Sequence, residues 1–340
     1  MRRGLVVGKF MPLHRGHQFL IDSALAQVDE LTVVVYDTYV DRETAVLMPA
    51  HKRAGWIQTL YPQVTNVVVR QDILTELTYE ERDKPEYAQA YADDLKFLGQ
   101  FTHVFSSENY GGPFAKALQA DHIIVDVDRG LMPISGTQVR SDLFRYRAWL
   151  DPIVYRSLIQ KVVFVGTEST GKSTISKALA EKYNTLWVHE YGRELWEEPG
   201  HTPRFEDFWK VGETQYAREQ AAALHANKYL FCDTNAWTTY QWSKLYYGTA
   251  DQKLIRLANS TVSEYAWFMC GNEFGWVDDG RRELKNNSRD FQIEQQAQLM
   301  RLGVPLVFLT GSVEERMRRV EGQLGISEKC FSLVTTADMV

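Results

Sequence analysis

The stretch GTESTGKS at residues 166–173 constrains the fold of this chain more than any other. It matches the pattern G-x-x-x-x-G-K-[ST], it follows the apolar run KVVFVG (161–166), and it precedes the helix-like segment TISKALAEKY (174–183). A glycine-rich turn between a strand and a helix offers backbone N–H groups that surround phosphates. The chain must therefore contain a parallel α/β sheet with a phosphate-binding loop almost halfway along its length.

Two side chains of this loop carry its chemistry. Lys172 would bridge the outer phosphates of ATP, and Ser173 would bind Mg²⁺. The alternative is a glycine-rich turn without a ligand, but the flanking strand and helix favour a nucleotide site. We expect nine consecutive residues to contact ATP: Gly166, Thr167, Glu168, Ser169, Thr170, Gly171, Lys172, Ser173 and Thr174.

Short apolar runs alternate with helix-like segments along the whole chain, which indicates βαβ units and buried parallel sheets. The pattern restarts at residue 161, so we place a domain boundary near Leu158 and expect two doubly wound α/β domains, 1–158 and 159–340. Such sheets bind ligands beyond the carboxyl ends of their strands. The expected strands are 5–10, 31–37, 64–70, 102–108, 122–128, 161–166, 185–191, 228–234, 265–270 and 305–311, and the clearest helices are 17–28, 49–62, 85–100 and 140–159.

Composition excludes several classes of protein. The formal net charge is −6 and no polybasic run is present, which argues against nucleic acid as a partner. The three cysteines show no metal or disulfide spacing, so a reducing compartment fits best. No stretch has the length of a signal peptide's apolar core or of a membrane helix. We therefore expect a cytoplasmic protein without a membrane partner.

The first expected strand ends in GKFMPLHRGH (8–17), where a helix should begin. Gly8 allows a ligand to approach the backbone closely. His14 and His17 would stand at the helix N-terminus, where free N–H groups and the helix dipole attract phosphate. Two imidazoles there could stabilise charge that grows on a phosphate oxygen. The alternative is that both histidines only shape the turn and cap the helix.

A second motif, ISGTQVR (134–140), follows the expected strand at 122–128. Ser135 and Thr137 can cap the next helix, and Arg140 would then reach the same strand ends as the histidines. An arginine there could hold the leaving β- and γ-phosphates of ATP in a bidentate fashion. The alternative is a well-capped helix with a surface arginine.

The later strands of the second half also end in polar residues. Glu190 and Arg193 follow the strand 185–191 in HEYGRE, where a carboxylate could act as a general base and an arginine could stabilise the transferring phosphate. Asp233 follows the next apolar run and would bind Mg²⁺ together with Ser173. Trp237 could flank a flat ring, although aromatic residues more often belong to the core. An exposed helix start with ordinary charges is the alternative for HEYGRE.

The segment GWVDDGRRELK (275–285) has the composition of a mobile lid. Gly280 would provide a hinge, and Arg281 or Arg282 would reach the γ-phosphate when the lid closes. A solvated, charged loop is the competing interpretation.

The two first-half motifs together resemble the nucleotidyltransferase superfamily, which carries (T/H)xGH and a later ISxTxxR. The resemblance implies adenylyl transfer, in which an acceptor attacks the α-phosphate of ATP and pyrophosphate leaves. It also implies that Lys9 and Phe10 line the ATP site beside the histidines. The segment SSENYGG (106–112) would bring Ser107, Glu108 and Tyr110 to the acceptor nucleotide, with a tight surface loop as the alternative.

The whole chain resembles NadR-type bifunctional enzymes, because GKFMPLHRGH, SSENYG, ISGTQVR, GTESTGKST, HEYGRE, CDTNAW and WVDDGRR occur in that family's order. The resemblance implies a Rossmann-like nucleotidyltransferase fold followed by a P-loop kinase fold. The kinase would convert nicotinamide riboside to nicotinamide mononucleotide (NMN), and the adenylyltransferase would convert NMN to NAD and pyrophosphate. Each step would use ATP and Mg²⁺. The implied riboside-binding residues are Glu190, Tyr191, Arg193, Asn235, Trp237, Trp276 and Asp278.

The sequence departs from this family at two places. Asn235 stands where an aspartate of a D-T-D motif would be expected. Some members carry an N-terminal helix-turn-helix domain, but here the first strand begins almost at Met1, so we expect no such domain and no DNA binding. Two other functions remain open: transfer to other acceptors by the same two catalytic halves, and a nucleotide-sensing regulator without turnover. A homo-oligomer fits the sequence as well as a monomer does.

Overall fold

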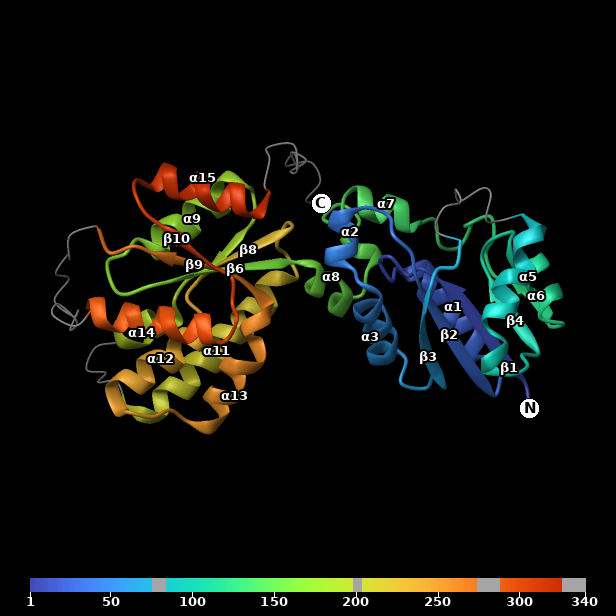
Figure 1. The fold of residues 1–340 in the computed structure, drawn as a ribbon, viewed down its shortest axis with the longest axis horizontal. Coiled ribbons are helices and arrows are strands. Elements are labelled where there is room, and N and C mark those ends of the chain that lie inside the picture. The colour runs from blue at the N-terminus through green and yellow to red at the C-terminus, as the bar shows by residue number, and fades with distance from the viewer. Residues whose placement is uncertain (75–83, 198–203, 274–287, 326–340) are drawn as a thin grey trace. The chain divides into compact units, whose positions relative to one another are not determined.

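The structure is a computed structural model of the chain, and it describes residues 1–74, 84–197, 204–273 and 288–325 (Figure 1). By its internal contacts the chain divides into two compact units, Met1–Leu158 and Ile159–Val340, which we name unit 1 and unit 2. Each unit contains a five-stranded parallel sheet with helices packed on it. The expected fold class, two α/β domains with parallel sheets, is therefore confirmed.

The sheet of unit 1 has the strand order β3-β2-β1-β4-β5. The order reverses beside β1, because β2 follows on one side and β4 on the other, and such a switch point is where parallel sheets bind ligands. The central strands are buried along nearly their whole length, as is typical of a parallel sheet covered on both faces. The strands are β1 (Arg3–Gly8), β2 (Glu30–Asp37), β3 (Asn66–Gln71), β4 (His103–Ser106) and β5 (Asp121–Ile124).

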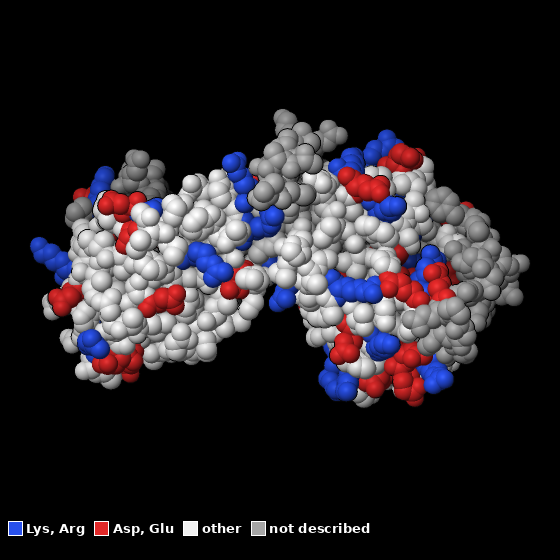
Figure 2. Space-filling model, turned by 180° about the vertical axis from the view of Figure 1, so that it is seen from behind, with Lys and Arg blue, Asp and Glu red and all other residues white. Residues whose placement is uncertain are grey.

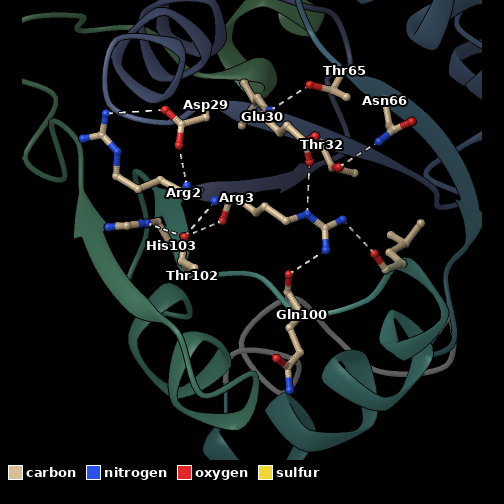
Figure 3. Close-up of polar contacts among 12 residues, drawn as sticks. Arg2, Arg3, Asp29, Glu30, Thr32, Thr65, Asn66, Gln100, Thr102 and His103 are labelled. Atoms are coloured by element: carbon tan, nitrogen blue, oxygen red, sulfur yellow. Dashed lines mark hydrogen bonds and ion pairs between the residues drawn. The ribbon is translucent and has the colours of Figure 1, made fainter.

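The N-terminal end of β1 is anchored by Arg3 (Figure 3). Its guanidinium donates to the backbone carbonyls of Gln100, at 2.9 Å, and of Leu98, at 3.1 Å, and forms an ion pair with Glu30 at 3.2 Å. These contacts join β1 to β2 and to the segment that leads into β4. The opposite end of the strand, at Gly8, leads into the histidine motif.

The helices of unit 1 agree with the expectation in three places and differ in one. The single helix expected over 140–159 is wrong, because one helix ends at Ser141 and the next begins only at Pro152. Proline has no N–H and disfavours helical backbone at the residue before it, here Asp151. The helices are α1 (Arg15–Leu25), α2 (Arg42–Leu47), α3 (Ala50–Leu60), α5 (Pro85–Asp94), α6 (Gly111–Ala117), α7 (Gly136–Ser141) and α8 (Pro152–Leu158), with short 3₁₀ turns at Lys96–Leu98 and Arg147–Trp149.

The sheet of unit 2 has the strand order β10-β9-β6-β8-β7, so its first strand, β6, lies in the middle. The core around β6 contains Val162, Phe164, Phe231 and Phe268, each 0% exposed. The phosphate-binding loop leaves the end of this central strand. The strands are β6 (Gln160–Val165), β7 (Leu186–Val188), β8 (Tyr229–Asp233), β9 (Tyr265–Cys270) and β10 (Leu306–Leu309).

Helices surround the sheet of unit 2, and acidic and basic side chains are interspersed over this unit on the face shown at the right of Figure 2. Among the described residues, none of the helices is both long and apolar enough to cross a membrane. The helices are α9 (Lys172–Lys182), α10 (Tyr191–Glu197), α11 (Phe205–Ala223), α12 (Ala236–Tyr247), α13 (Gln252–Thr261), α14 (Ser288–Arg301) and α15 (Val313–Leu324), with a 3₁₀ turn at Val262–Glu264.

Candidate active sites

A cleft of about 610 Å³ opens at the carboxyl edge of the unit 1 sheet, beside the switch point at β1. The structure brings every residue that the sequence suggested for the first site to the lining of this cleft, although they come from three distant segments. These residues are Gly8, Lys9, Phe10, His14, His17, Ser107, Glu108, Tyr110, Ser135, Thr137 and Arg140.

The two histidines of the motif lie face to face at the start of α1. Their ring centroids are 3.7 Å apart and the ring planes differ by 24°. The backbone N–H of His14 donates to Nδ1 of His17 at 3.4 Å, so a neutral His17 carries its proton on Nε2. Nδ1 of His14 is buried and has no hydrogen-bond partner in the structure. The ring of Phe10 meets that of His17 edge to face, with 5.0 Å between centroids.

Both imidazoles are neutral at physiological pH. Burial, together with the nearby charges of Arg129 and Arg140, lowers the pKa of His14 to about 4. Burial also lowers the pKa of His17 well below its ordinary value, and the stacked His14 ring adds to the effect because two protonated imidazoles would repel each other. The pair can therefore supply N–H donors to a phosphate oxygen, but it carries no positive charge of its own. The positive charge of the cleft comes from its arginines.

Arg140 reaches the cleft from α7, as its motif indicated. Its Nη1 donates to the carbonyl of Met11 at 2.6 Å and its Nη2 to the hydroxyl of Thr137 at 3.2 Å. Ser135 caps α7 by accepting from the N–H of Gln138 at 3.2 Å, whereas Thr137 lies inside the first turn. Arg140 thus touches the loop that carries the histidines, which places a guanidinium within the same cleft.

The structure adds Arg129, which the sequence reading missed. It donates to the carbonyl of Ile134 at 2.9 Å and to the carboxylate of Glu108 at 3.4 Å, and it lines the cleft. Its charge also acts on both histidines. In the sequence, Arg129 is only a basic residue shortly before ISGTQVR. Such residues are too common for this position alone to indicate a functional role.

The cleft extends to the ends of β2 and β3, where Asp72 accepts from the hydroxyls of Thr38 at 2.6 Å and Tyr91 at 2.8 Å. These residues were also missed. The signal was again weak, since each of Thr38 and Asp72 is merely a polar residue that follows an apolar run.

Hydrogen bonds to residues of β1 and β5 hold the loop after β4 in place. The hydroxyl of Ser106 donates to the carbonyl of Glu108 at 2.9 Å and lies 2.8 Å from Nε2 of His122. Tyr110 donates through its hydroxyl to the carbonyl of Val7 on β1, at 3.1 Å. The loop then enters α6 at Gly111. These contacts favour the interpretation that the loop forms a wall of the cleft over the alternative that it is a surface loop.

In unit 2 the predicted phosphate-binding loop connects β6 to α9. Gly166, Ser169 and Gly171 have positive φ angles of 139°, 62° and 83°, a conformation that directs successive N–H groups towards a common centre. The Nζ of Lys172 donates to the carbonyl of Thr167 at 2.8 Å. The hydroxyl of Thr170 also donates to that carbonyl, at 2.8 Å, so the loop is internally braced.

Glu190 lies in the electrostatic field of this loop. Its pKa is raised to about 7, because burial and the carboxylate of Asp233 raise it more than Lys172 and Arg193 lower it. The structure therefore brings together residues that follow β6, β7 and β8. A carboxylate with a pKa near neutrality is suited to accept a proton during catalysis.

The segment after β8 contains Asp233, Asn235 and Trp237. Oδ1 of Asp233 and Nδ2 of Asn235 are buried and have no hydrogen-bond partner in the structure, which is costly unless a ligand completes them. Oδ1 of Asn235 caps α12 by accepting from the N–H of Thr238 at 3.1 Å. Trp237 is 1% exposed and packs edge to face against a core tryptophan, so its indole belongs to the core and not to an open ring-binding site.

The start of α10 is held by a buried side chain that the sequence reading missed. Gln215 on α11 accepts from the N–H of Tyr191 at 2.9 Å, and the guanidinium of Arg218 lies 4.6 Å from the centroid of the Tyr191 ring. Tyr191 is thus fixed at the same edge as Glu190. The lid interpretation concerns residues outside the described part of the chain: Trp276, Asp278, Gly280, Arg281 and Arg282.

Comparisons with known proteins agree with the division of the chain into unit 1 and unit 2. Residues 5–141 match the family described as cytidylyltransferase-like, and residues 161–316 match the family described as AAA domain. The chain is 30% identical over 306 residues to the trifunctional NAD biosynthesis/regulator protein NadR of Salmonella typhimurium, covering 83% of this chain and 72% of that relative.

Two crystal structures have a similar fold over nearly the whole chain. A NadR protein in complex with NR has a TM-score of 0.58 and 21% identity, covering 98% of this chain and 98% of that one. A NadR protein in complex with NAD and AMP-PNP has a TM-score of 0.55 and 21% identity, covering 96% and 97%.

Proposed function

Because this chain belongs to the family of NadR proteins, which supports transferase activity in NAD biosynthesis, we propose that it makes NAD from nicotinamide riboside in two ATP-dependent steps. Unit 2 phosphorylates the riboside to NMN, and unit 1 transfers an adenylyl group from a second ATP to NMN. The names of the structural relatives support these substrates, since they report complexes with NR, NAD and AMP-PNP.

The environment of Glu190 is the observation that carries this proposal. A protein that only senses nucleotides needs a phosphate-binding loop, but it does not need a carboxylate whose pKa is raised to about 7 beside Lys172. In the proposed kinase step, Glu190 takes the proton of the riboside 5′-hydroxyl while the hydroxyl oxygen attacks the γ-phosphorus of ATP. The bond from that phosphorus to the β-phosphate oxygen breaks and ADP leaves. Lys172 and Arg193 balance the negative charge of the moving phosphate.

The residues around the loop fit a bound Mg²⁺. Ser173 lies in the first turn of α9, and the buried Oδ1 of Asp233 has no hydrogen-bond partner among the described residues, so both oxygens suit a hard cation. In the described part of the chain, no cluster of three or more His, Cys, Asp or Glu side chains could hold a metal by itself. A Mg²⁺ ion held by Ser173 and Asp233 would therefore need the nucleotide phosphates as further ligands. When bound, it would neutralise part of their charge.

In the proposed adenylyl transfer, an oxygen of the NMN phosphate attacks the α-phosphorus of ATP and pyrophosphate leaves. The neutral His17 donates from Nε2 to a non-bridging oxygen of the α-phosphate, where charge grows in the transition state. Arg140 and Arg129 supply the positive charge that the neutral histidines lack. Ser107, Glu108 and Tyr110 form the wall of the cleft beside the acceptor.

The test is to incubate the protein with nicotinamide riboside, ATP and Mg²⁺ and to follow products by chromatography and mass spectrometry. We expect ADP and NMN first, then NAD and pyrophosphate. NMN without NAD would contradict the assignment of unit 1. Formation of neither product would favour other acceptors or a sensor, and release of ADP or pyrophosphate with another acceptor would separate these two.

A further inference from the structure

In the described part of unit 1, one arginine has a completely buried side chain. Arg53 on α3 is 0% exposed, and its guanidinium faces only backbone carbonyls and one carboxylate. Nε donates to the carbonyl of Met48 at 2.8 Å, and Nη1 donates to the carbonyls of Lys9 and, at 2.9 Å, of Tyr36. Nη2 pairs with Asp37 at 3.1 Å. One side chain therefore joins α3, the end of β2 and the first residue of the histidine loop.

Unit 2 contains an arginine in the same situation. Arg316 on α15 is 1% exposed, and its Nε donates to the carbonyl of Gly311 at 3.1 Å. Nη1 donates to the carbonyl of Thr170, inside the phosphate-binding loop, at 2.6 Å. Nη2 donates to the carbonyl of Gly271 at 3.3 Å and pairs with Glu273 at 2.7 Å. This side chain joins α15, the segment after β9 and the apex of the loop.

The two arrangements use the same kinds of partner. In each, Nε binds the carbonyl five residues earlier, Nη1 binds a carbonyl of the phosphate-facing loop, and one further carbonyl comes from the end of a neighbouring strand. In each, the balancing carboxylate is partly exposed, 49% for Asp37 and 38% for Glu273. Burying a guanidinium is costly unless it is paired and hydrogen-bonded, and each of these has one carboxylate and three carbonyl partners. Such agreement between two unrelated sheets indicates a shared positioning role.

We propose that Arg53 and Arg316 are positioning residues, each of which holds the phosphate-facing loop of its own unit in the geometry that phosphoryl chemistry requires. Arg53 acts on the loop of His14 and His17 through Lys9, and Arg316 acts on the loop of Lys172 through Thr170. Each guanidinium makes four hydrogen bonds, one more than the three N–H donors of a lysine ammonium can make, so lysine cannot reproduce the arrangement. This inference rests on the proposed function, because its main readouts are the two activities.

The closing experiment uses each activity as the control for the other. Arg53→Lys should lower kcat for adenylyl transfer by about 10²-fold, as expected for a small misplacement of catalytic groups, and leave riboside phosphorylation within twofold. Arg316→Lys should do the reverse. Arg42→Lys and Arg319→Lys, at exposed positions on α2 and α15, are matched controls that should keep both activities. Added methylguanidinium should restore part of the lost activity to Arg53→Ala or Arg316→Ala in the affected unit alone.

Hydrogen exchange provides a readout that does not depend on turnover. Amides of residues 9–14 in Arg53→Lys, and of 166–171 in Arg316→Lys, should exchange at least tenfold faster while the sheets stay protected. If the wild type lacks an activity but the loops respond in this way, the proposed function fails and the positioning role stands. Unchanged loop exchange, kcat within threefold of wild type, or unfolding of a whole unit by the lysine variant would each overturn the positioning role.

Discussion

His14 and His17 stack with 3.7 Å between their ring centroids, and the backbone N–H of His14 donates to Nδ1 of His17. The stack depends on Gly16, because a Cβ there would lie 3.0 Å from Cε1 and 3.1 Å from Nδ1 of His14. Both imidazoles are neutral, so they act through N–H donors and not through charge. Their contribution should consequently appear in the transition state for adenylyl transfer and nowhere else.

Replacing His17 by alanine should lower kcat for formation of NAD from NMN by about 10²–10³-fold, because an aligned donor to the α-phosphate is lost. Riboside phosphorylation should be unchanged. Pyrophosphate release and ADP formation, measured on the same preparation, separate the two effects. His51→Ala, at an exposed position on α3, is the matched control. Equal loss of both activities in a folded protein would contradict two independent sites.

Acid should destabilise unit 1 through the buried histidines. The pKa of His14 is about 4 in the folded state against an ordinary 6.5, so the unfolded chain binds the proton first. Stability is then present above pH 6.5 and is lost as the pH falls towards 4, by up to about 1.4 kcal/mol per pH unit. Urea unfolding of unit 1 between pH 7 and about pH 5 should show a shallower dependence in His14→Gln. The same slope in both proteins would count against the buried, neutral state.

Lys172→Ala should reduce riboside phosphorylation by about 10³-fold or more, since the outer phosphates lose their bridging cation, and should spare adenylyl transfer. The measurement is ADP formation with nicotinamide riboside as acceptor. Lys177→Ala on the same helix is the control, because its side chain is 58% exposed and forms only a surface ion pair with Glu181. A kinase rate near that of the wild type would remove the loop from the reaction.

Glu190→Gln should slow phosphoryl transfer by roughly 10²–10⁴-fold if Glu190 is the general base. Only the deprotonated carboxylate accepts the proton, so the wild-type rate should rise with pH and level off above its pKa of about 7. The variant should lose this rise. Glu197→Gln, at an exposed position on α10, the helix that follows Glu190, should keep it. A rate within a few-fold of wild type would leave Glu190 as a substrate contact.

The sequence predicted the fold well because parallel sheets leave a strong local signal. β1, β2, β6 and β8 are buried on both faces, so each is a nearly continuous run of apolar residues. Motifs at the ends of such runs must meet at one sheet edge, which is how His14 could be associated with Arg140. The prediction of a single helix at 140–159 was wrong because it gave more weight to the helix-like composition of this segment than to the proline inside it.

The residues that the sequence did not reveal act over long separations. Arg53 binds Lys9 across 44 residues, and Arg316 binds Thr170 across 146. In the sequence each is one charged residue on an amphipathic helix, where a solvated face is the ordinary expectation. Arg129 likewise acquires its importance only from the fold, which places its charge beside the histidines. Local pattern cannot show such partners, because they are defined by tertiary structure alone.

The final prediction concerns the loop that forms the acceptor wall of the cleft. A Cβ at Gly111 would lie 2.0 Å from Oγ of Ser106 and 2.3 Å from Nε2 of His122, whereas a Cβ at Gly112 would lie 3.7 Å from the same imidazole. Gly111→Ala must therefore break the contact between Ser106 and His122 that anchors the carbonyl of Glu108.

We expect Gly111→Ala to destabilise unit 1 by about 1–3 kcal/mol, the usual cost of overpacking, and to raise KM for NMN more than it lowers kcat. Gly112→Ala should be neutral or slightly stabilising, since alanine favours the helix. Urea unfolding and adenylyl-transfer kinetics on the two variants provide the comparison. If both variants behaved alike, the Ser106–His122 contact would not be what holds this wall, because only Gly111 faces that pair at a distance that no side chain can occupy.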